Sequence, residues 1–385
     1  MSGLVLVADD LTGALDSAVS FCGSLGPIPV CLGATQDPVT EHAAFDLATR
    51  DATAGFAVEA TLRIAPRMAG AGTAYKKIDS LLRGHWAIEL AALIGTRAFG
   101  PCILAPAFPS QGRTTLQGRQ WVCGSDGAPT LVAVDPAEAL ERLGLRVAKI
   151  GVSHASQAMA CDADVMLCDA AGDDDLRRIV GGVSMNRRAD GPPVLWCGSA
   201  GLARALAGQV PPCRREIEAP VLSIIGTAHP VSRAQIAHAL TTRAASHVVM
   251  SVPVARVAER IAERIGLALG RSGACLLTFD FPDGTPAGVA ADAIGQGLRG
   301  VLPAIPRPAS LLVAGGETLL SVCRAVGASH LEVNAEHSPG VPRSRLCGGW
   351  WQGVDVVSKS GGFGHAQWLS ELMPFSPLNG DSRHL

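Results

Sequence analysis

The chain has 385 residues, which predicts two domains, and its 48% hydrophobic and 17% charged content excludes a disordered chain. A net charge of −2 and the lack of any apolar run near the roughly 18 residues of a membrane span argue against a nucleic-acid or membrane partner. Eleven scattered cysteines without a C-x-x-C pair, and a start (residues 1–9) without the basic region of a signal peptide, lead us to expect a cytoplasmic protein.

Short Val/Ile/Leu/Ala runs alternate with stretches of helical periodicity along the whole chain, which is typical of α/β domains with parallel sheets. The first series of predicted strands is 4–8, 29–32, 45–48, 75–78, 102–105, 165–168 and 194–197. Continuous hydrophobicity in several of them indicates that both faces of the sheet are buried. The segment 117–134, rich in Gly, Pro and Thr, is predicted to be an excursion that covers the substrate.

Residues 208–219, with two prolines and a cluster of charges, are predicted to be a linker. A second series of strands follows at 221–225, 247–251, 274–279, 311–314 and 354–357. We therefore predict an α/β protein with two domains, 1–212 and 213–385, each built on a mostly parallel sheet flanked by helices.

Ligands of open α/β sheets bind at the carboxyl ends of the strands, so the residues that follow each strand are the candidates. In the first domain these residues are acids, bases and small polar groups: Asp9, Asp10, Lys77, Asp79, Ser80, Arg83, Gly84, Gln111, Arg113 and Thr114. Acids that bind hydroxyls and bases that bind a carboxylate predict a site for a small polyhydroxy acid. Taken alone, each residue also has a purely structural explanation. Asp10 could serve merely as the N-cap of a helix at 11–21, and each base could be a solvated surface charge.

The second domain has three glycine-rich junctions between a strand and a helix. The candidate residues at these junctions are Thr227, His229, Gly315, Gly316, Glu317, Thr318, Lys359, Ser360, Gly361 and Gly362. Glycine lets backbone N–H groups approach an anion at a helix N-terminus, so three such junctions favour a nucleoside triphosphate, although any one could be a tight turn. The chain lacks G-x-x-x-x-G-K-[ST] and a well-placed G-x-G-x-x-G, so neither a P-loop nor a Rossmann dinucleotide site is indicated.

Together these motifs resemble the four-carbon acid sugar kinase family, which phosphorylates tetronic acids such as D-threonate, D-erythronate and 3-oxo-tetronates at O4. The resemblance spans nearly the whole chain, through Asp-Asp-Leu-Thr-Gly-Ala at 9–14, Lys-x-Asp-Ser-x-x-Arg-Gly at 77–84, Pro-Ala-x-x-x-x-Gly-Arg at 106–113, Gly-Ser-Ala-Gly-Leu-Ala at 198–203, Gly-Gly-Glu-Thr at 315–318, Pro-Gly-Val-Pro at 339–342 and Lys-Ser-Gly-x-Phe-Gly at 359–364. It implies a sugar-acid-binding first domain, an ATP-binding second domain and an active site in the cleft between them. His229, Leu319 and Gly362 depart from the family pattern, which has Ser, Ser and Asn there.

The resemblance implies ATP and Mg²⁺ as cofactors, a small sugar acid as substrate, and closure of the domains about the linker; a homodimer is compatible with the sequence. The glycine turns and Lys359 would hold the triphosphate, with Glu317 supporting the metal ion. Lys77, Arg83 and Arg113 would hold the substrate carboxylate and the developing charge.

Asp10 or Asp79 would accept the O4 proton. Asp79 shares a strand face with Lys77, which would lower its pKa, whereas the charge of Asp9 would raise the pKa of Asp10, so we favour Asp10 as the base.

Two rival functions follow from the same sequence. The departures at His229 and Gly362 suggest a sugar-acid sensor that kept the fold and lost the chemistry. A nicotinamide-dependent sugar-acid dehydrogenase would also suit an α/β protein with a polyol-acid site, but it needs the dinucleotide motif that the chain lacks.

Overall fold

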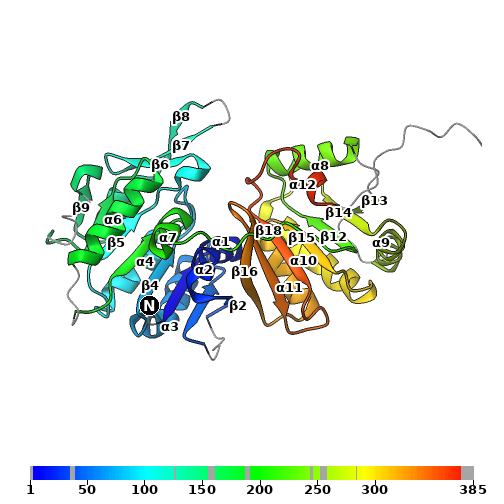
Figure 1. The fold of residues 1–385 in the computed structure, drawn as a ribbon, viewed down its shortest axis with the longest axis horizontal. Coiled ribbons are helices and arrows are strands. Elements are labelled where there is room, and N and C mark those ends of the chain that lie inside the picture. Colours follow the sequence, from blue (N-terminus) through cyan, green and yellow to red (C-terminus); the bar gives the residue numbers. More distant parts are fainter. Residues whose placement is uncertain are drawn as a thin grey trace, which may run out of the picture. The chain divides into compact units, whose positions relative to one another are not determined.

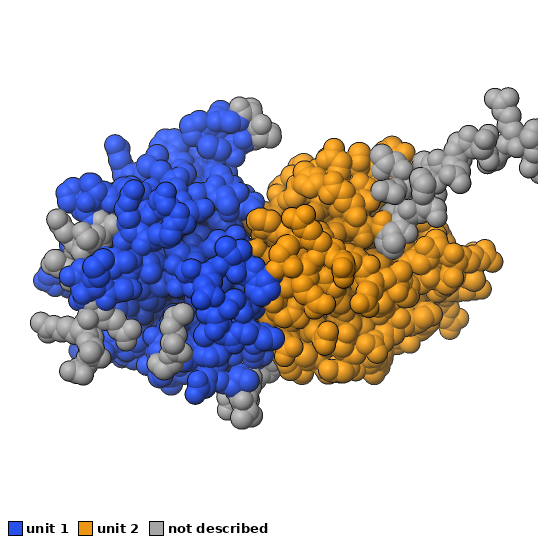
Figure 2. Space-filling view, in the orientation of Figure 1, with its two compact units in different colours: residues 1–212 blue, residues 213–385 orange. Residues whose placement is uncertain are grey.

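A computed structural model describes residues 3–34, 40–124, 127–154, 161–186, 191–242, 246–251, 258–282 and 284–373. The chain forms two compact units, unit 1 at Met1–Pro212 and unit 2 at Cys213–Leu385 (Figure 2). Each unit carries its own hydrophobic core and is described separately below. None of the helices in the described ranges is long and apolar enough to span a membrane.

Unit 1 is built on a parallel sheet with the strand order β2-β3-β1-β4-β11-β5-β10-β9 (Figure 1). Its strands are β1 (Leu4–Ala8), β2 (Ile28–Leu32), β3 (His42–Asp46), β4 (Thr73–Lys77), β5 (Cys102–Ala105), β9 (Val147–Ile150), β10 (Val165–Cys168) and β11 (Leu195–Gly198). Its helices are α1 (Leu11–Ala18), α2 (Cys22–Leu25), α3 (Ala54–Ala69), α4 (Trp86–Gly95), α5 (Pro136–Glu141), α6 (Asp173–Asn186) and α7 (Ala200–Ala207), with short 3₁₀ turns at Val19–Phe21 and Pro109–Gln111.

The sheet of unit 1 is covered by helices on both faces. Apolar residues of α3, α4 and α5 pack with the strands in one core cluster, while α7 packs against both α1 and α6. All residues of β1, β5, β10 and β11 are buried, as the continuous hydrophobic runs predict.

Unit 2 combines parallel and antiparallel pairing in the strand order β13-β14-β12-β15-β18-β17-β16. The strands are β12 (Val221–Ile225), β13 (Ser246–Ser251), β14 (Ala274–Asp280), β15 (Ser310–Ala314), β16 (His330–Ser338), β17 (Val341–Cys347) and β18 (Asp355–Lys359). The helices are α8 (Pro230–Thr242), α9 (Ala258–Ser272), α10 (Ala287–Val301), α11 (Gly316–Val326) and α12 (Trp368–Leu372), with a 3₁₀ turn at Leu302–Ala304. Pairing is parallel from β13 to β18 and antiparallel from β18 to β16.

The two mostly parallel α/β domains confirm the predicted fold class, but several segments differ from the prediction. The predicted excursion at 117–134 holds two strands, β7 (Arg119–Cys123) and β8 (Pro129–Leu131), which form a small antiparallel sheet with the preceding β6 (Arg113–Leu116). The sequence reasoning also missed β9 and the hairpin β16–β17. The strand predicted at 45–48 ends at Asp46, because Ala48 has a φ of 51°, in the left-handed region.

Helix starts and ends differ as well. The helix predicted at 11–21 is α1 followed by a 3₁₀ turn. Helix α11 begins at Gly316, directly after the glycine junction, and Pro230 is the first residue of α8.

Candidate functional site

The polar residues of unit 1 gather at the carboxyl ends of three adjacent strands. Strand β1 lies between β3 and β4, with Ala8 opposite both Asp46 and Lys77 in the register. Asp9 and Asp10 therefore follow the central strand, while the loops after β3 and β4 flank them. The loop after β3 folds back on β1, since the N–H groups of residues 49 and 50 both donate to the carbonyl oxygen of Asp9 at 3.0 and 3.2 Å.

Arg50 is the central cation of this site, and the sequence reasoning did not include it. Its Nε and Nη2 atoms bind the two carboxylate oxygens of Asp9 at 2.8 and 3.0 Å. The same Nη2 lies 2.7 Å from Asp10 Oδ1 and 3.6 Å from Asp79 Oδ2. One guanidinium thus joins the three acids of the site. Arg50 follows β3, so applying the strand-end rule to that strand, as to β1 and β4, would have found it.

The two adjacent acids have different surroundings. Burial raises the pKa of Asp9 in spite of Arg50, and the charge of Asp10 adds to this increase. Burial also acts on Asp10, but the charges of Arg50 and Lys77 and a 2.6 Å hydrogen bond from Thr12 lower its pKa below the ordinary value. The expectation that Asp9 raises the pKa of Asp10 is therefore wrong, because the cations outweigh the like charge.

Asp10 also begins a helix, as the simpler alternative predicts. Its Oδ1 accepts a hydrogen bond from the N–H of Gly13 at 3.0 Å, which makes it the N-cap of α1. A side chain at Gly13 would place its Cβ 2.5 Å from Asp10 Oδ1 and 2.7 Å from the Lys77 nitrogen. The lysine and the aspartate therefore approach each other across a position that needs glycine. Lys77 is buried, 6% exposed.

Asp79 is engaged with its own loop. Its Oδ1 accepts from the N–H of Leu81 at 3.0 Å, and its two oxygens bind Nε and Nη2 of Arg83 at 2.9 and 2.6 Å. Burial would raise the pKa of Asp79, but the hydrogen bond from Arg83 and the charge of Arg50 lower it far below the ordinary value, as predicted in direction. Arg83, which is predicted to hold the substrate carboxylate, lies in the loop after β4, where it is mostly exposed and paired with Asp79.

The remaining predicted residues of unit 1 line the same region from two loops. Gly84 has a φ of 79°, and a Cβ there would lie 3.3 Å from the backbone of Arg50, so glycine lets this loop approach the cation. The guanidinium of Arg113 donates to the carbonyl oxygen of Gln111. Burial lowers the pKa of Arg113 although the nearby charge of Asp79 opposes this. Thr114 lies next to it in β6, and Ser80 follows Asp79.

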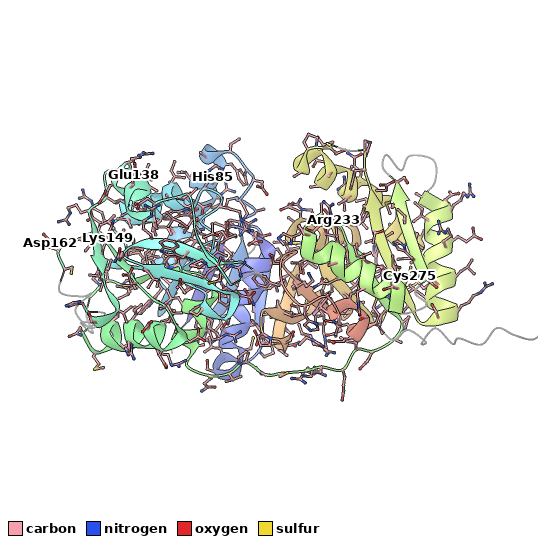
Figure 3. All side chains as sticks on the ribbon, turned by 90° about the horizontal axis from the view of Figure 1, so that it is seen from above. His85, Glu138, Lys149, Asp162, Arg233 and Cys275 are labelled. Atoms are coloured by element: carbon pink, nitrogen blue, oxygen red, sulfur yellow. The ribbon has the colours of Figure 1, made fainter. Side chains whose placement is uncertain are left out.

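In unit 2 the three glycine-rich junctions come together. A Cβ at Gly361 would lie 2.5 Å from Thr227 Oγ1, and one at Gly315 would lie 3.5 Å from Thr227 Cβ. A Cβ at Gly362 would lie 3.2 Å from the His229 ring. The turns after β12, β15 and β18 thus pack on one another. Arg233 Nε, on α8, holds the first turn through a 2.9 Å bond to the carbonyl oxygen of residue 228 (Figure 3).

The N-terminus of α11 has the features of an anion site. Gly315 precedes it with a φ of 104°, a conformation that favours glycine, and its N–H donates to the Lys359 carbonyl oxygen at 3.0 Å. The N-cap residue is Gly315, which has no side chain that could cap this helix end. The N–H groups of its first turn, which holds Gly316, Glu317 and Thr318, are therefore suited to phosphate oxygens.

Lys359 does not lie in the turn as predicted but ends β18, with 1% of its surface exposed. Its ammonium donates to Ser232 Oγ and the Ser360 carbonyl oxygen, both at 3.2 Å, and to the Gly361 carbonyl oxygen at 3.5 Å. It also lies 5.1 Å from the centre of the Trp368 ring. Burial lowers its pKa to about 7. Lys359 thus stabilises the turn 360–364 through its carbonyl oxygens.

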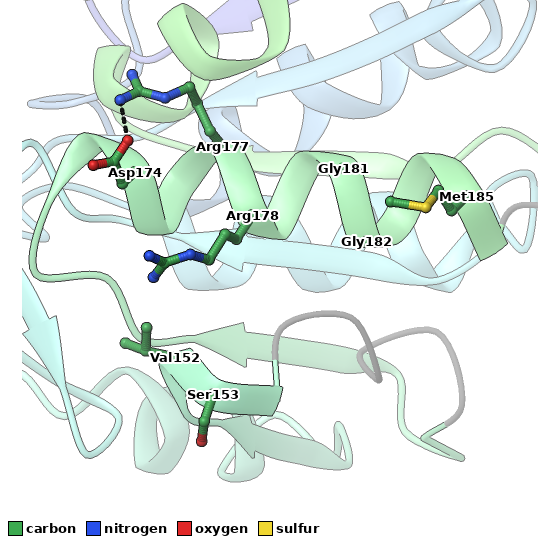
Figure 4. A pocket seen from close by; sticks show the side chains of 8 residues that line it. All are labelled: Val152, Ser153, Asp174, Arg177, Arg178, Gly181, Gly182 and Met185. Atoms are coloured by element: carbon green, nitrogen blue, oxygen red, sulfur yellow. Dashed lines mark hydrogen bonds and ion pairs between the residues drawn. The ribbon is translucent and has the colours of Figure 1, made fainter.

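No group of three or more His, Cys, Asp and Glu residues within the described ranges is arranged to hold a metal ion. A hollow of about 530 Å³ lies at α6, lined by Val152, Ser153, Asp174, Arg177, Arg178, Gly181, Gly182 and Met185 (Figure 4). Its Arg177 is paired with Asp174, and none of its lining residues belongs to the predicted sites.

Comparison with known proteins assigns a kind of ligand to each unit. A family model described as a sugar-binding N-terminal domain matches residues 4–206, and one described as a nucleotide-binding C-terminal domain matches residues 222–369. The chain is 31% identical to a D-threonate kinase of Bordetella bronchiseptica, over 93% of this chain and 94% of that protein. It is 26% identical to a D-erythronate kinase of Heliobacterium modesticaldum, over 95% of each.

Solved structures share the fold. A Salmonella typhimurium protein described as a putative tRNA synthase superposes with a TM-score of 0.73 at 20% identity, over 96% of this chain and 98% of that one. A Haemophilus influenzae protein gives 0.68 at 18% identity, over 96% and 99%.

Proposed function

Because the chain belongs to the four-carbon acid sugar kinase family, we propose that it is an ATP-dependent kinase that phosphorylates a four-carbon sugar acid at O4. The substrate would be threonate, erythronate or a 3-oxo-tetronate, the acids named for its relatives. The observation that carries the proposal is the arrangement of Asp10 and Asp79 around Arg50 in the sugar-binding unit, with the Lys77 ammonium close to Asp10.

This arrangement suits a polyhydroxy acid. The carboxylates of Asp10 and Asp79 are held by the same guanidinium nitrogen and keep 11% and 8% of their side-chain surfaces exposed, so both can accept hydrogen bonds from substrate hydroxyls. Among the described residues, no carboxylate forms a direct ion pair with Lys77, which leaves its ammonium for an anionic group of the substrate. Arg113 would bind the other end of the acid.

Asp10 is proposed as the group that orients the attacking hydroxyl and accepts its proton. Asp79 accepts four hydrogen bonds from its own loop, from the N–H groups of Leu81 and Arg83 and from Nε and Nη2 of the Arg83 side chain. Asp10 accepts three, so more of its lone pairs are open to substrate. The low pKa of Asp10 makes it a weak base but keeps it ionised, which suffices in phosphoryl transfer, where positioning and charge stabilisation provide most of the catalysis.

The turns of unit 2 would hold the triphosphate. The N–H groups at the start of α11 would bind phosphate oxygens, since the N-cap residue Gly315 carries no side chain, and Thr227 adds a hydroxyl where the turns meet. Glu317, in the first turn of α11, is the carboxylate that could support Mg²⁺, an ion that commonly takes one or two carboxylates and the substrate phosphates as ligands. The active site between the two domains, and closure about the linker 208–219, belong to this proposal.

The test is a panel of D-threonate, D-erythronate, L-threonate and 3-oxo-tetronates with ATP and Mg²⁺, with ADP release followed by a coupled assay and the product identified by mass spectrometry. We expect one acid to be phosphorylated with a kcat/KM at least about tenfold above the others. The 4-deoxy form of that acid should bind without ADP release. Binding of an acid with no turnover of any panel member would instead support the sensor, and would refute the kinase.

A further inference from the structure

Gln120, on β7 of the small antiparallel sheet, is fully buried and joins two loops of the sugar-acid site. Its Nε2 donates to the carbonyl oxygen of Ser80 at 2.8 Å and to that of Pro106 at 3.3 Å. Its Oε1 accepts from the hydroxyl of Thr115 at 2.7 Å. Both hydrogens of the amide nitrogen and one oxygen lone pair are therefore used inside the protein.

The orientation of this amide follows from its partners. Carbonyl oxygens can only accept, so the side-chain nitrogen must face Ser80 and Pro106 and the oxygen must face Thr115. Ser80 directly follows Asp79, and Pro106 opens the loop that leads to Arg113. One side chain thus ties the loop after β4 to the loop after β5, although β11 lies between these strands in the sheet.

We propose that Gln120 is a positioning residue that fixes the two substrate loops relative to each other. This inference rests on the proposed function for the nature of the ligand. Without the two bonds, the loop after β4 and the loop after β5 would move independently. The distance between the Asp79 carboxylate, which would accept from substrate hydroxyls, and the Arg113 guanidinium would then vary. Binding of the sugar acid would weaken, while nucleotide binding in unit 2 would not change.

Unit 2 has a matched counterpart in Gln235, on α8. It is also fully buried, and its Nε2 donates to the carbonyl oxygens of Phe363 and His365 at 3.1 and 3.0 Å. These bonds hold the turn after β18, whose Gly361 and Gly362 pack on the other glycine junctions. The two glutamines therefore have the same chemistry and the same burial but support different sites.

The experiment replaces each glutamine by methionine, which is close in size and cannot donate. Gln120→Met should raise the KM for the sugar acid about tenfold, the scale of two lost hydrogen bonds, with the KM for ATP within twofold of wild type. Gln235→Met should raise the KM for ATP by a similar factor and leave that for the acid. A general loss of stability would lower the melting temperature but would not change the KM for the acid in one variant and the KM for ATP in the other. Equal changes of both KM values in both variants would therefore overturn the proposal.

A second variant and a second readout make the test independent of folding and of the proposed function. Thr115→Val keeps the amide but removes the group that orients it, and should raise the acid KM in the same direction by a smaller factor. Hydrogen exchange followed by mass spectrometry, without any ligand, should show faster exchange at 78–85 and 106–112 in Gln120→Met, and not in Gln235→Met. Unchanged exchange in both loops would refute the positioning role, whereas a wild-type protein inactive on every acid would refute only the proposed kinase.

Discussion

Replacing Asp10 by Asn separates the two roles that the structure gives this residue. Asparagine caps a helix about as well as aspartate, so the bond from the Gly13 N–H to the side-chain oxygen can remain. The change removes one negative charge beside Arg50, so the hydrogen bond from the guanidinium keeps only the charge of its donor, which costs about 1 kcal/mol of unfolding free energy. The expected loss of stability is therefore small.

The expected loss of activity is much larger. If Asp10 orients the O4 hydroxyl and accepts its proton, Asp10→Asn should lower kcat by about 10²-fold or more, because an amide oxygen cannot take the proton. The KM for ATP should stay within about twofold of wild type. Steady-state kinetics with the preferred acid, together with urea unfolding of the same preparation, measure both quantities.

Asp79→Asn is the matched control, since Asp79 lies at the end of the neighbouring strand and contacts the same Arg50 nitrogen. This variant should reduce kcat less and raise the KM for the acid more, because its main effect is to loosen the loop that Arg83 and Leu81 hold to it. If Asp79→Asn abolished turnover while Asp10→Asn retained most of it, the assignment of the base would be refuted and the two roles exchanged.

Three further variants test the other parts of the site. Gly361→Ala puts a Cβ 2.5 Å from the hydroxyl of the neighbouring turn and should raise the KM for ATP at least about tenfold, whereas Gly288→Ala, whose Cβ meets open space, should be silent in the same assay. Arg50→Lys keeps the charge but loses the two parallel hydrogen bonds to Asp9, so kcat/KM for the acid should fall about ten- to a hundredfold. This loss should exceed that of Arg83→Lys, and equal losses in the two variants would count against the central role of Arg50. Burial lowers the pKa of Lys359 to about 7 from 10.5, so between about pH 7 and 10 this side chain binds fewer protons in the folded chain than in the unfolded one. Urea unfolding should therefore show the stability of the wild type rising with pH relative to that of Lys359→Met. Parallel stability curves for the two proteins would refute the lowered pKa.

The sequence predicted most of the parallel strands well because most of them are buried on both faces, whereas the missed strand β9 is partly exposed. Strands such as β5, β10 and β12 appear as short apolar runs between breakers, and their predicted limits match the structure. The strands of β6–β8 are partly exposed, and β16 alternates buried and half-buried residues. Hydrophobic runs alone do not reveal such strands, since the second face carries polar side chains.

For the site, the rule that ligands bind at strand ends identified the loops that carry polar residues, but it did not identify which base forms an ion pair with which acid. The sequence places Asp10, Asp79 and Lys77 at one sheet edge because they follow strands, and the register of β1 with its neighbours then follows from the parallel order. Which base meets which acid depends on the path of the loop after β3, and that path is set by the bonds of its backbone to the Asp9 carbonyl oxygen. No local pattern encodes those bonds.

Lys359 is a second residue whose contacts could not be predicted from the sequence. A lysine next to a glycine turn reads in sequence as a phosphate ligand, yet one residue of strand length decides whether its side chain belongs to the turn or to the core. In the structure β18 extends to Lys359, and its ammonium binds the carbonyl oxygens of the turn. The ammonium of Lys359 thus supports the backbone of the turn, and under the proposed function the N–H groups at the start of α11 would be phosphate donors beside it.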